Sequence, residues 1–123
     1  MAKIAILAGE PSGDLIASQL MAYVGSKVKN IEFVGVGGPL MRQQGLRSFF
    51  DYSNLSLYGV FQVIPNIPKL IFLRYKLINY LKNEKPDIFI GVDAPDFNFY
   101  VEKKLKQSGI PTFHYVAPSV WAW

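Results

Sequence analysis

The 123-residue sequence predicts an α/β fold, with a Rossmann-like parallel sheet that carries helices on both faces. Short apolar runs, such as residues 4–8 and 87–92, are typical of parallel strands buried on both faces. Segments with apolar residues at helical spacing separate these runs. Strands that alternate with helices form βαβ units, whose right-handed crossovers make the sheet parallel. At this length we expect one domain with a substantial core.

Proline and glycine residues mark where several of the predicted helices begin and end. Pro68 can occupy the first position of a helix, and Gly25, Gly45 and Gly109 end helices. The section from Leu46 to Val63 mixes aromatic and polar residues without a clear period, so its structure is left open. The predicted elements are, in order, strand 4–8, helix 15–24, strand 31–36, helix 40–44, helix 68–84, strand 87–92, helix 98–108 and strand 112–116.

Composition and charge exclude several classes of protein. Half of the residues are hydrophobic, 18% are charged and the mean hydropathy is +0.18, which excludes a disordered chain. Because there is no cysteine and His114 is the one histidine, neither a metal site nor a Ser-His-Asp triad is expected. His114 lies in an apolar strand and is a second-rank catalytic candidate, more typical of a core residue. The net charge of +4 suits anionic substrates or lipid head groups, and equally a solvated basic surface.

The amino terminus shows no signal peptide, because Met1-Ala2-Lys3 runs directly into the first strand. No uninterrupted apolar segment is long enough to span a bilayer. We therefore expect a cytoplasmic protein, with no nucleic-acid partner.

The turn Gly9-Glu10-Pro11-Ser12-Gly13-Asp14 is not a standard phosphate-binding loop. It lacks the three glycines of the dinucleotide fingerprint and the Gly-Lys-Ser/Thr of a P-loop. Its two carboxylates would also repel a phosphate. Two interpretations stay open: Ser12 or Asp14 caps the following helix, or Glu10 and Asp14 contact sugar hydroxyls, from which carboxylates accept hydrogen bonds well.

The end of the second strand is a better candidate for an anion site. Gly37 and Gly38 allow backbone N–H groups to turn toward one point, and Pro39 begins a helix whose dipole favours negative charge. Arg42 lies one turn further on. A plain strand-to-helix turn explains the same residues.

The segment from Ile90 to Asn98 carries the strongest argument for a site, because ligands of open α/β sheets bind at the carboxyl ends of the strands. Asp96 lies just before the expected start of a helix at Asn98, where a capping role explains it. Asp93 lies at the end of the strand, where capping explains it poorly, so it is the better candidate for a general base. A buried acid held by loop amides is the alternative.

Four segments of the chain resemble the lipid-A-disaccharide synthase family. In the family's order they are Ala8–Asp14, Phe33–Pro39, Lys85–Asn98 and His114–Trp123, and they span nearly the whole chain. The last two are long and highly specific. Pro11 and Ala117 stand where the family often has other small residues, and neither departure alters a charged position.

The resemblance implies a membrane-associated glycosyltransferase in which two Rossmann-like domains face a cleft, the GT-B architecture. Such an enzyme joins UDP-2,3-diacylglucosamine to 2,3-diacylglucosamine 1-phosphate, releases UDP and forms the lipid A disaccharide. In this inverting reaction a base takes the proton of the acceptor hydroxyl while its oxygen attacks the anomeric carbon. The implied location is cytoplasmic and peripheral to the inner membrane. No cofactor is implied, and a homodimer is left open.

The resemblance also implies roles for individual residues. Asp93 matches the candidate base, and Glu10, Ser12 and Asp14 match the first loop that faces the cleft. With the residues discussed above, the expected substrate-binding set is Glu10, Ser12, Asp14, Gly37, Gly38, Arg42 and Asn98. The segment from Tyr58 to Tyr75 matches the region that meets the membrane, and it explains the high hydropathy. A helix that is apolar nearly all round is otherwise normally buried. The residues expected at the membrane or acyl chains are Val60, Phe61, Ile64, Ile67, Leu70 and Phe72.

The chain ends after an aromatic segment, where a further helix would be expected to cover the sheet. We therefore expect residues 1–123 to be the amino-terminal half of a GT-B fold, without the UDP-sugar domain and without transferase activity alone. A non-catalytic lipid- or membrane-binding module derived from the same domain is the alternative. A nucleotide-dependent oxidoreductase is a weaker interpretation, because the acidic first loop argues against it.

Overall fold

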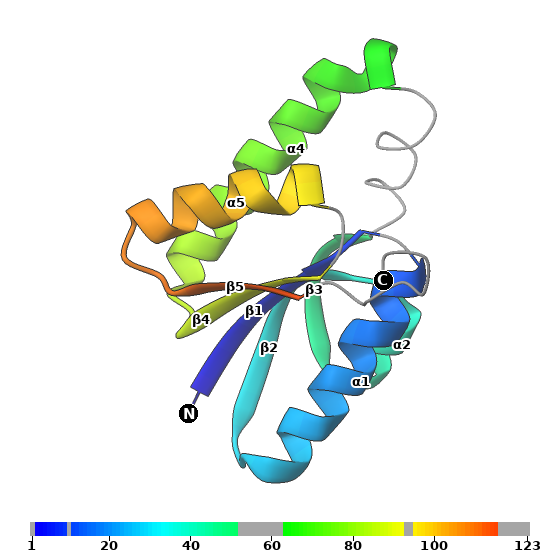
Figure 1. Ribbon diagram of the computed structural model, residues 1–123, viewed down its shortest axis with the longest axis vertical. Helices are drawn as coiled ribbons and strands as arrows, with labels where there is room; N and C mark the ends of the chain where they lie inside the picture. Colours follow the sequence, from blue (N-terminus) through cyan, green and yellow to red (C-terminus); the bar gives the residue numbers. More distant parts are fainter. Residues whose placement is uncertain (1, 10, 52–62, 93–94, 116–123) are drawn as a thin grey trace, which may run out of the picture.

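The computed structural model describes residues 2–9, 11–51, 63–92 and 95–115. Within these ranges strands and helices alternate, as the sequence predicts (Figure 1). The elements are β1 Ala2–Ala8, α1 Pro11–Lys27, β2 Ile31–Gly37, α2 Pro39–Gln43, β3 Leu46–Asp51, α4 Val63–Glu84, β4 Ile88–Val92, α5 Pro95–Gln107 and β5 Thr112–Tyr115.

The strands form one five-stranded sheet of order β3-β2-β1-β4-β5, in which every neighbouring pair is parallel. From β1 the chain adds β2 and β3 on one side, and then crosses to add β4 and β5 on the other. This reversal makes a topological switch point between β1 and β4, the arrangement of half a doubly wound Rossmann fold. The predicted fold class is confirmed.

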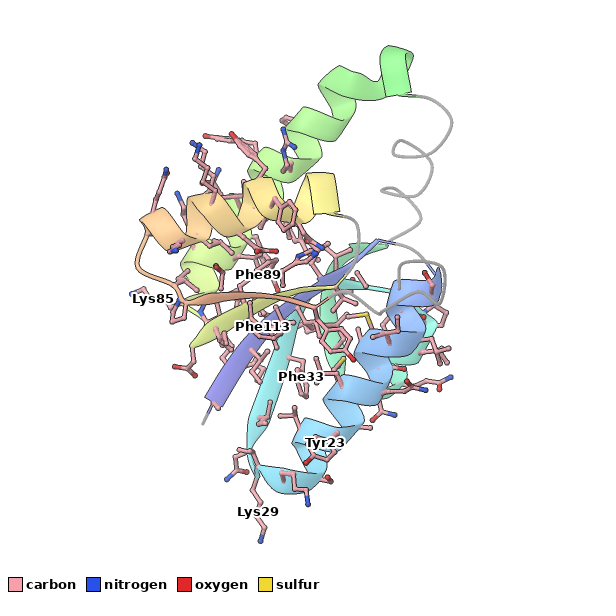
Figure 2. All side chains as sticks on the ribbon, viewed as in Figure 1. Tyr23, Lys29, Phe33, Lys85, Phe89 and Phe113 are labelled. Atoms are coloured by element: carbon pink, nitrogen blue, oxygen red, sulfur yellow. The ribbon has the colours of Figure 1, made fainter. Side chains whose placement is uncertain are left out.

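Helices cover both faces of the sheet, with α1 and α2 on one side and α4 and α5 on the other (Figure 1). Strand alternation divides the core accordingly. In β1, Ala5 and Leu7 pack toward α4 and α5, whereas Ile6 and Ala8 pack toward α1. Figure 2 labels one large side chain of each half, Phe89 on the α5 side and Phe33 on the α1 side.

Two helices extend further than the sequence indicates. Helix α1 continues through Gly25 to Lys27, and the chain turns instead at Asn30, whose φ is 60°. A glycine inside a helix costs only about 1 kcal/mol, which burial of the α1 face offsets. Helix α4 begins at Val63 and not at Pro68. Pro65 lies in its first turn, where the backbone N–H groups have no intrahelical partner, so a proline is tolerated there.

Two further differences concern α5 and the section after α2. Helix α5 begins at Pro95, three residues before the predicted start, and residues 46–51 form the edge strand β3. The predicted stop at Gly109 is confirmed: its φ is +86°, and Ile110 N–H donates to the Leu105 carbonyl at 3.1 Å. This pattern is a Schellman motif, in which glycine adopts the left-handed conformation at no steric cost.

Candidate site at the carboxyl edge of the sheet

The switch point lies where β1 and β4 end side by side. Ala8, the last residue of β1, pairs with Val92, the last residue of β4. The segments after these two strands therefore start next to one another, at the place where open α/β sheets bind ligands. Glu10 and Asp93 belong to these segments but lie outside the described residues. Their predicted roles stay predictions.

Asp14 caps a helix, but not the helix that contains it. Its carboxylate accepts hydrogen bonds from the backbone N–H groups of Gly38, Leu40 and Met41, at 3.0, 3.1 and 3.0 Å. These are the unpaired N–H groups at the start of α2, and a negative charge suits that end of a helix. Asp14 is 3% exposed, so its carboxylate is positioned for this contact and not for a sugar hydroxyl. The interpretation of Asp14 as a cap of its own helix is wrong.

The same contact changes the interpretation of the predicted anion site at Gly37-Gly38-Pro39. Backbone N–H groups do converge there, as the glycines indicated, but the anion that they hold is the Asp14 carboxylate. The fit is tight, because a Cβ on Gly38 would lie 2.6 Å from Asp14 Oδ2. These donors are satisfied within the protein, which removes the structural basis for a substrate phosphate at this point. Arg42 lies on the surface of α2, with Nη2 3.5 Å from the Gly37 carbonyl.

The remaining predicted polar residues divide between surface and interior. Ser12 is exposed in the first turn of α1, which starts at Pro11, so Ser12 is inside the helix and does not cap it. Asn98 is completely buried and donates from Nδ2 to the Val92 carbonyl at 3.4 Å. Asp96 falls in the first turn of α5 and not before its start, so the predicted capping position is wrong.

Sequence reasoning missed one polar contact near this edge. His114 Nδ1 of β5 lies 2.7 Å from Glu102 Oε2 of α5, and the two side chains are 12% and 13% exposed. The Phe99 ring packs against the imidazole, with centroids 4.6 Å apart. The available sequence signal was Gly91 within an apolar strand, which the structure pairs with His114. The glutamate four residues after Asn98 completes the pattern on one face of α5.

The predicted membrane segment is described only in part. Val60 and Phe61 lie outside the described residues, and Ile64, Ile67 and Leu70 lie in α4, where only the course of the backbone is described. Phe72 is 56% exposed, although Leu77, Ile78 and Leu81 of the same helix are buried. Figure 1 shows the start of α4 extending beyond the sheet and beyond α5. Of the helices that the structure describes, none is long and apolar enough to cross a bilayer.

A parallel sheet of order 3-2-1-4-5, with helices on both faces, defines a Rossmann-like unit, and the carboxyl edge beside its switch point is where such sheets bind ligands. Within residues 2–9, 11–51, 63–92 and 95–115, no group of three or more His, Asp or Glu side chains is placed to bind a metal ion. Comparison with known proteins assigns the unit to one family.

The sequence profile described as lipid-A-disaccharide synthetase matches residues 4–123, so this chain belongs to that family. Over 121 residues it is 53% identical to the lipid-A-disaccharide synthase of Idiomarina loihiensis and 50% identical to that of Pseudomonas fluorescens. The Azotobacter vinelandii enzyme of the same name is 46% identical over 121 residues. In each case the match covers 98% of this chain and 32% of the relative, so the chain spans about a third of the length of these relatives.

Proposed function

We propose that this chain supplies the acceptor side of a glycosyltransferase of lipid A biosynthesis. The reaction joins UDP-2,3-diacylglucosamine to 2,3-diacylglucosamine 1-phosphate, with UDP as the leaving group. The pairing of Ala8 with Val92 supports the proposal, because Glu10 and Asp93 follow these two strand ends closely in the sequence. The names of the relatives supply the reaction class.

In this proposal Asp93 is the general base. It takes the proton from the acceptor hydroxyl as that oxygen attacks the anomeric carbon of the UDP-sugar, and the bond to UDP breaks in the same displacement. Asp14 and Asn98 do not touch the substrate in this scheme. Asp14 fixes the start of α2, and Asn98 fixes the end of β4.

The test of the base is Asp93→Asn in a full-length protein that carries this segment, with UDP release as the measurement. A general base contributes a factor of roughly 10² to 10⁴ in rate, so turnover is expected to fall by that factor while acceptor binding persists. Asp87→Asn is the matched control, because Asp87 precedes the same strand at its opposite end. Unchanged turnover in Asp93→Asn would contradict the assignment.

The same reasoning predicts that residues 1–123 alone do not turn over substrate. The relatives are about three times as long, and a transferase needs groups that bind its donor as well as its acceptor. Turnover by the purified 123-residue chain that depends on Asp93 would refute this proposal. Binding of the acceptor without turnover would agree with it.

We further propose that α4 meets the membrane surface. Its exposed Phe72 and Tyr75 lie among cationic side chains, and Lys76 Nζ lies 5.0 Å from the Phe72 ring centroid. Beside them a groove of about 590 Å³ lies between α4 and α5. Its lining is aromatic and basic, and includes Phe72, Arg74, Tyr75, Lys82, Tyr100 and Lys104. This combination suits an interface with anionic head groups.

Binding to phosphatidylglycerol-containing vesicles tests this contact. Burial of one phenylalanine contributes about 1.5–3 kcal/mol, so Phe72→Ser is expected to weaken binding by about tenfold or more. Tyr23→Ser is the matched control, because Tyr23 is an exposed aromatic residue with Lys27 Nζ 5.6 Å from its ring, on the opposite side of the sheet. If both variants lose vesicle binding equally, Phe72 and α4 are not the site of membrane contact.

A further inference from the structure

Among the described residues, the core between α5 and the strands β4 and β5 is largely apolar. There Asn98 is completely buried and Glu102 and His114 are largely buried, next to Gly91. Burial of polar and charged groups costs free energy unless they are paired. Their presence at the carboxyl edge of a sheet, in place of aliphatic side chains, therefore calls for a role.

Gly91 makes the space for this cluster. It pairs with His114 across the sheet, and a Cβ at Gly91 would lie 2.6 Å from Glu102 Oε2 and 2.9 Å from Asn98 Cγ. Asn98 and Glu102 are four residues apart, so they share one face of α5. Because glycine has no side chain, Asn98 and Glu102 of α5 can lie directly against the backbone of β4 at Gly91.

The contacts orient the histidine ring. Nδ1 of His114 lies 2.7 Å from Glu102 Oε2, within hydrogen-bonding distance. Nε2 is buried, and no residue that the structure describes forms a hydrogen bond with it. The Phe99 ring packs against the imidazole and restricts its movement. Glu102 and Phe99 therefore fix the direction in which the ring points.

The same helix face also holds the end of β4. Asn98 Nδ2 donates to the carbonyl of Val92, the last residue before Asp93, and α5 begins only three residues after Val92. Contacts made by α5 thus fix the backbone immediately before Asp93, and α5 itself starts two residues after it. A displacement of α5 against β4 and β5 would move both ends of this short connection.

We propose that Asn98, Glu102 and His114 form a polar bracket that positions Asp93 for catalysis. The bracket rests on the proposed function of Asp93 as the base, and none of its members contacts substrate. Glu102 and His114 anchor α5 to β5, and Asn98 anchors α5 to β4. They are positioning residues, and they act on the rate of the chemical step through the geometry of the base.

Glu102→Gln and His114→Gln in the full-length protein test the bracket, with Lys103→Gln, at an exposed position of α5, as the matched control. Misplacement of a catalytic group by about 1 Å costs on the order of 10²-fold in rate. We expect kcat to fall 10- to 100-fold in both variants with KM unchanged, and Lys103→Gln to have no effect. Because the two residues act as a pair, the double variant should be no slower than the slower single variant.

A spectroscopic readout separates positioning from a loss of fold. In the ¹⁵N-histidine-labelled protein, the His114 signals are those missing in His114→Gln, and they should shift in Glu102→Gln. Native spectra elsewhere with a lowered kcat support the bracket. If kcat is unchanged in Glu102→Gln and His114→Gln while Asp93→Asn is inactive, the bracket is refuted and the role of Asp93 as the base still holds. Normal turnover in Asp93→Asn overturns the role of Asp93 and the bracket with it.

Discussion

The two edges of the sheet hold their polar groups in opposite ways. At the amino edge, Lys3 and Arg47 share Glu84, each at 2.9 Å, and Arg47 also pairs with Glu32. These ion pairs are accessible to solvent, because Arg47 is 51% exposed, although Glu84 is only 19% exposed. At the carboxyl edge, Asp14 and Asn98 are almost completely buried, and each is bonded to backbone groups of another element.

The difference indicates what each edge does. Surface ion pairs contribute little to stability, are screened by salt and tolerate replacement. Buried polar groups bonded to backbone have a fixed geometry and a high cost if one partner is lost. The amino edge therefore joins α4 to the sheet, whereas the carboxyl edge holds the starts of α2 and α5 in fixed positions around the switch point. Substitutions at the two edges should differ accordingly.

The largest expected effect is that of Asp14→Ala. It leaves three backbone N–H groups at the start of α2 without an acceptor, and we expect a loss of about 3 kcal/mol in the free energy of unfolding. Asp87→Ala is the control from the other edge, because its carboxylate accepts a hydrogen bond from Lys3 N–H at an exposed position. Denaturant titration gives both values. Similar costs for the two variants would remove the distinction between the edges.

Gly91→Ala is expected to have the next largest effect. The added Cβ would meet Glu102 and Asn98 at less than 3.0 Å, and such overpacking costs about 1–3 kcal/mol. In contrast, Gly25→Ala adds a methyl group into open space at an exposed position of helix α1 and should stabilise the protein by about 0.5–1 kcal/mol. Thermal unfolding of both variants measures the two shifts. A Gly91→Ala protein as stable as the parent would show that the cluster above Gly91 is loosely packed.

Glu84→Gln tests the amino edge through pH. Hydrogen bonds from Lys3 and then from Arg47 lower the pKa of Glu84 below its ordinary value of 4.5. A carboxyl with a lower pKa in the folded state stabilises the fold above its unfolded pKa, and this stabilisation is lost as the pH falls through the folded pKa. The variant should therefore be less stable by about 1 kcal/mol at pH 7 and equal to the parent at pH values below the folded pKa. A constant difference across this range would contradict the ion-pair origin.

Much of the fold was predictable from the sequence, because apolar runs and helical spacing report local burial. Edge strand β3 escaped prediction since Arg47 and Ser48 interrupt its apolar pattern, as an edge position permits. The early start of α4 escaped because prolines in a first turn do not require a helix to begin there. In both cases the local sequence signal was weak, and packing against the rest of the fold determined the structure.

The site was predictable only in part. The strand end before Asp93 could be located, because an acid after a buried strand is a local pattern. The contact of Asp14 with α2 could not, since it joins residues 24 or more positions apart and depends on the packing of α1 against α2. The Glu102–His114 pair likewise requires the register of β5 on β4. Gly91 within an apolar strand was the one sequence clue to a close approach there.

The smallest expected effect is that of Arg47→Gln, which probes the most exposed member of these ion pairs. The variant loses ion pairs to Glu84 and Glu32, and we expect a cost of about 0.5 kcal/mol at 0.1 M salt. The Debye length falls from about 10 Å at 0.1 M to about 3 Å at 1 M salt, so the cost should shrink toward zero at the higher concentration. Denaturation with urea, which is uncharged, leaves the ionic strength under control. The cost of Asp14→Ala, measured in parallel, should hardly change with salt, because its hydrogen bonds are buried. A salt response of the same size at both edges would mean that solvent reaches the Asp14 carboxylate, and that the two edges differ in geometry but not in screening.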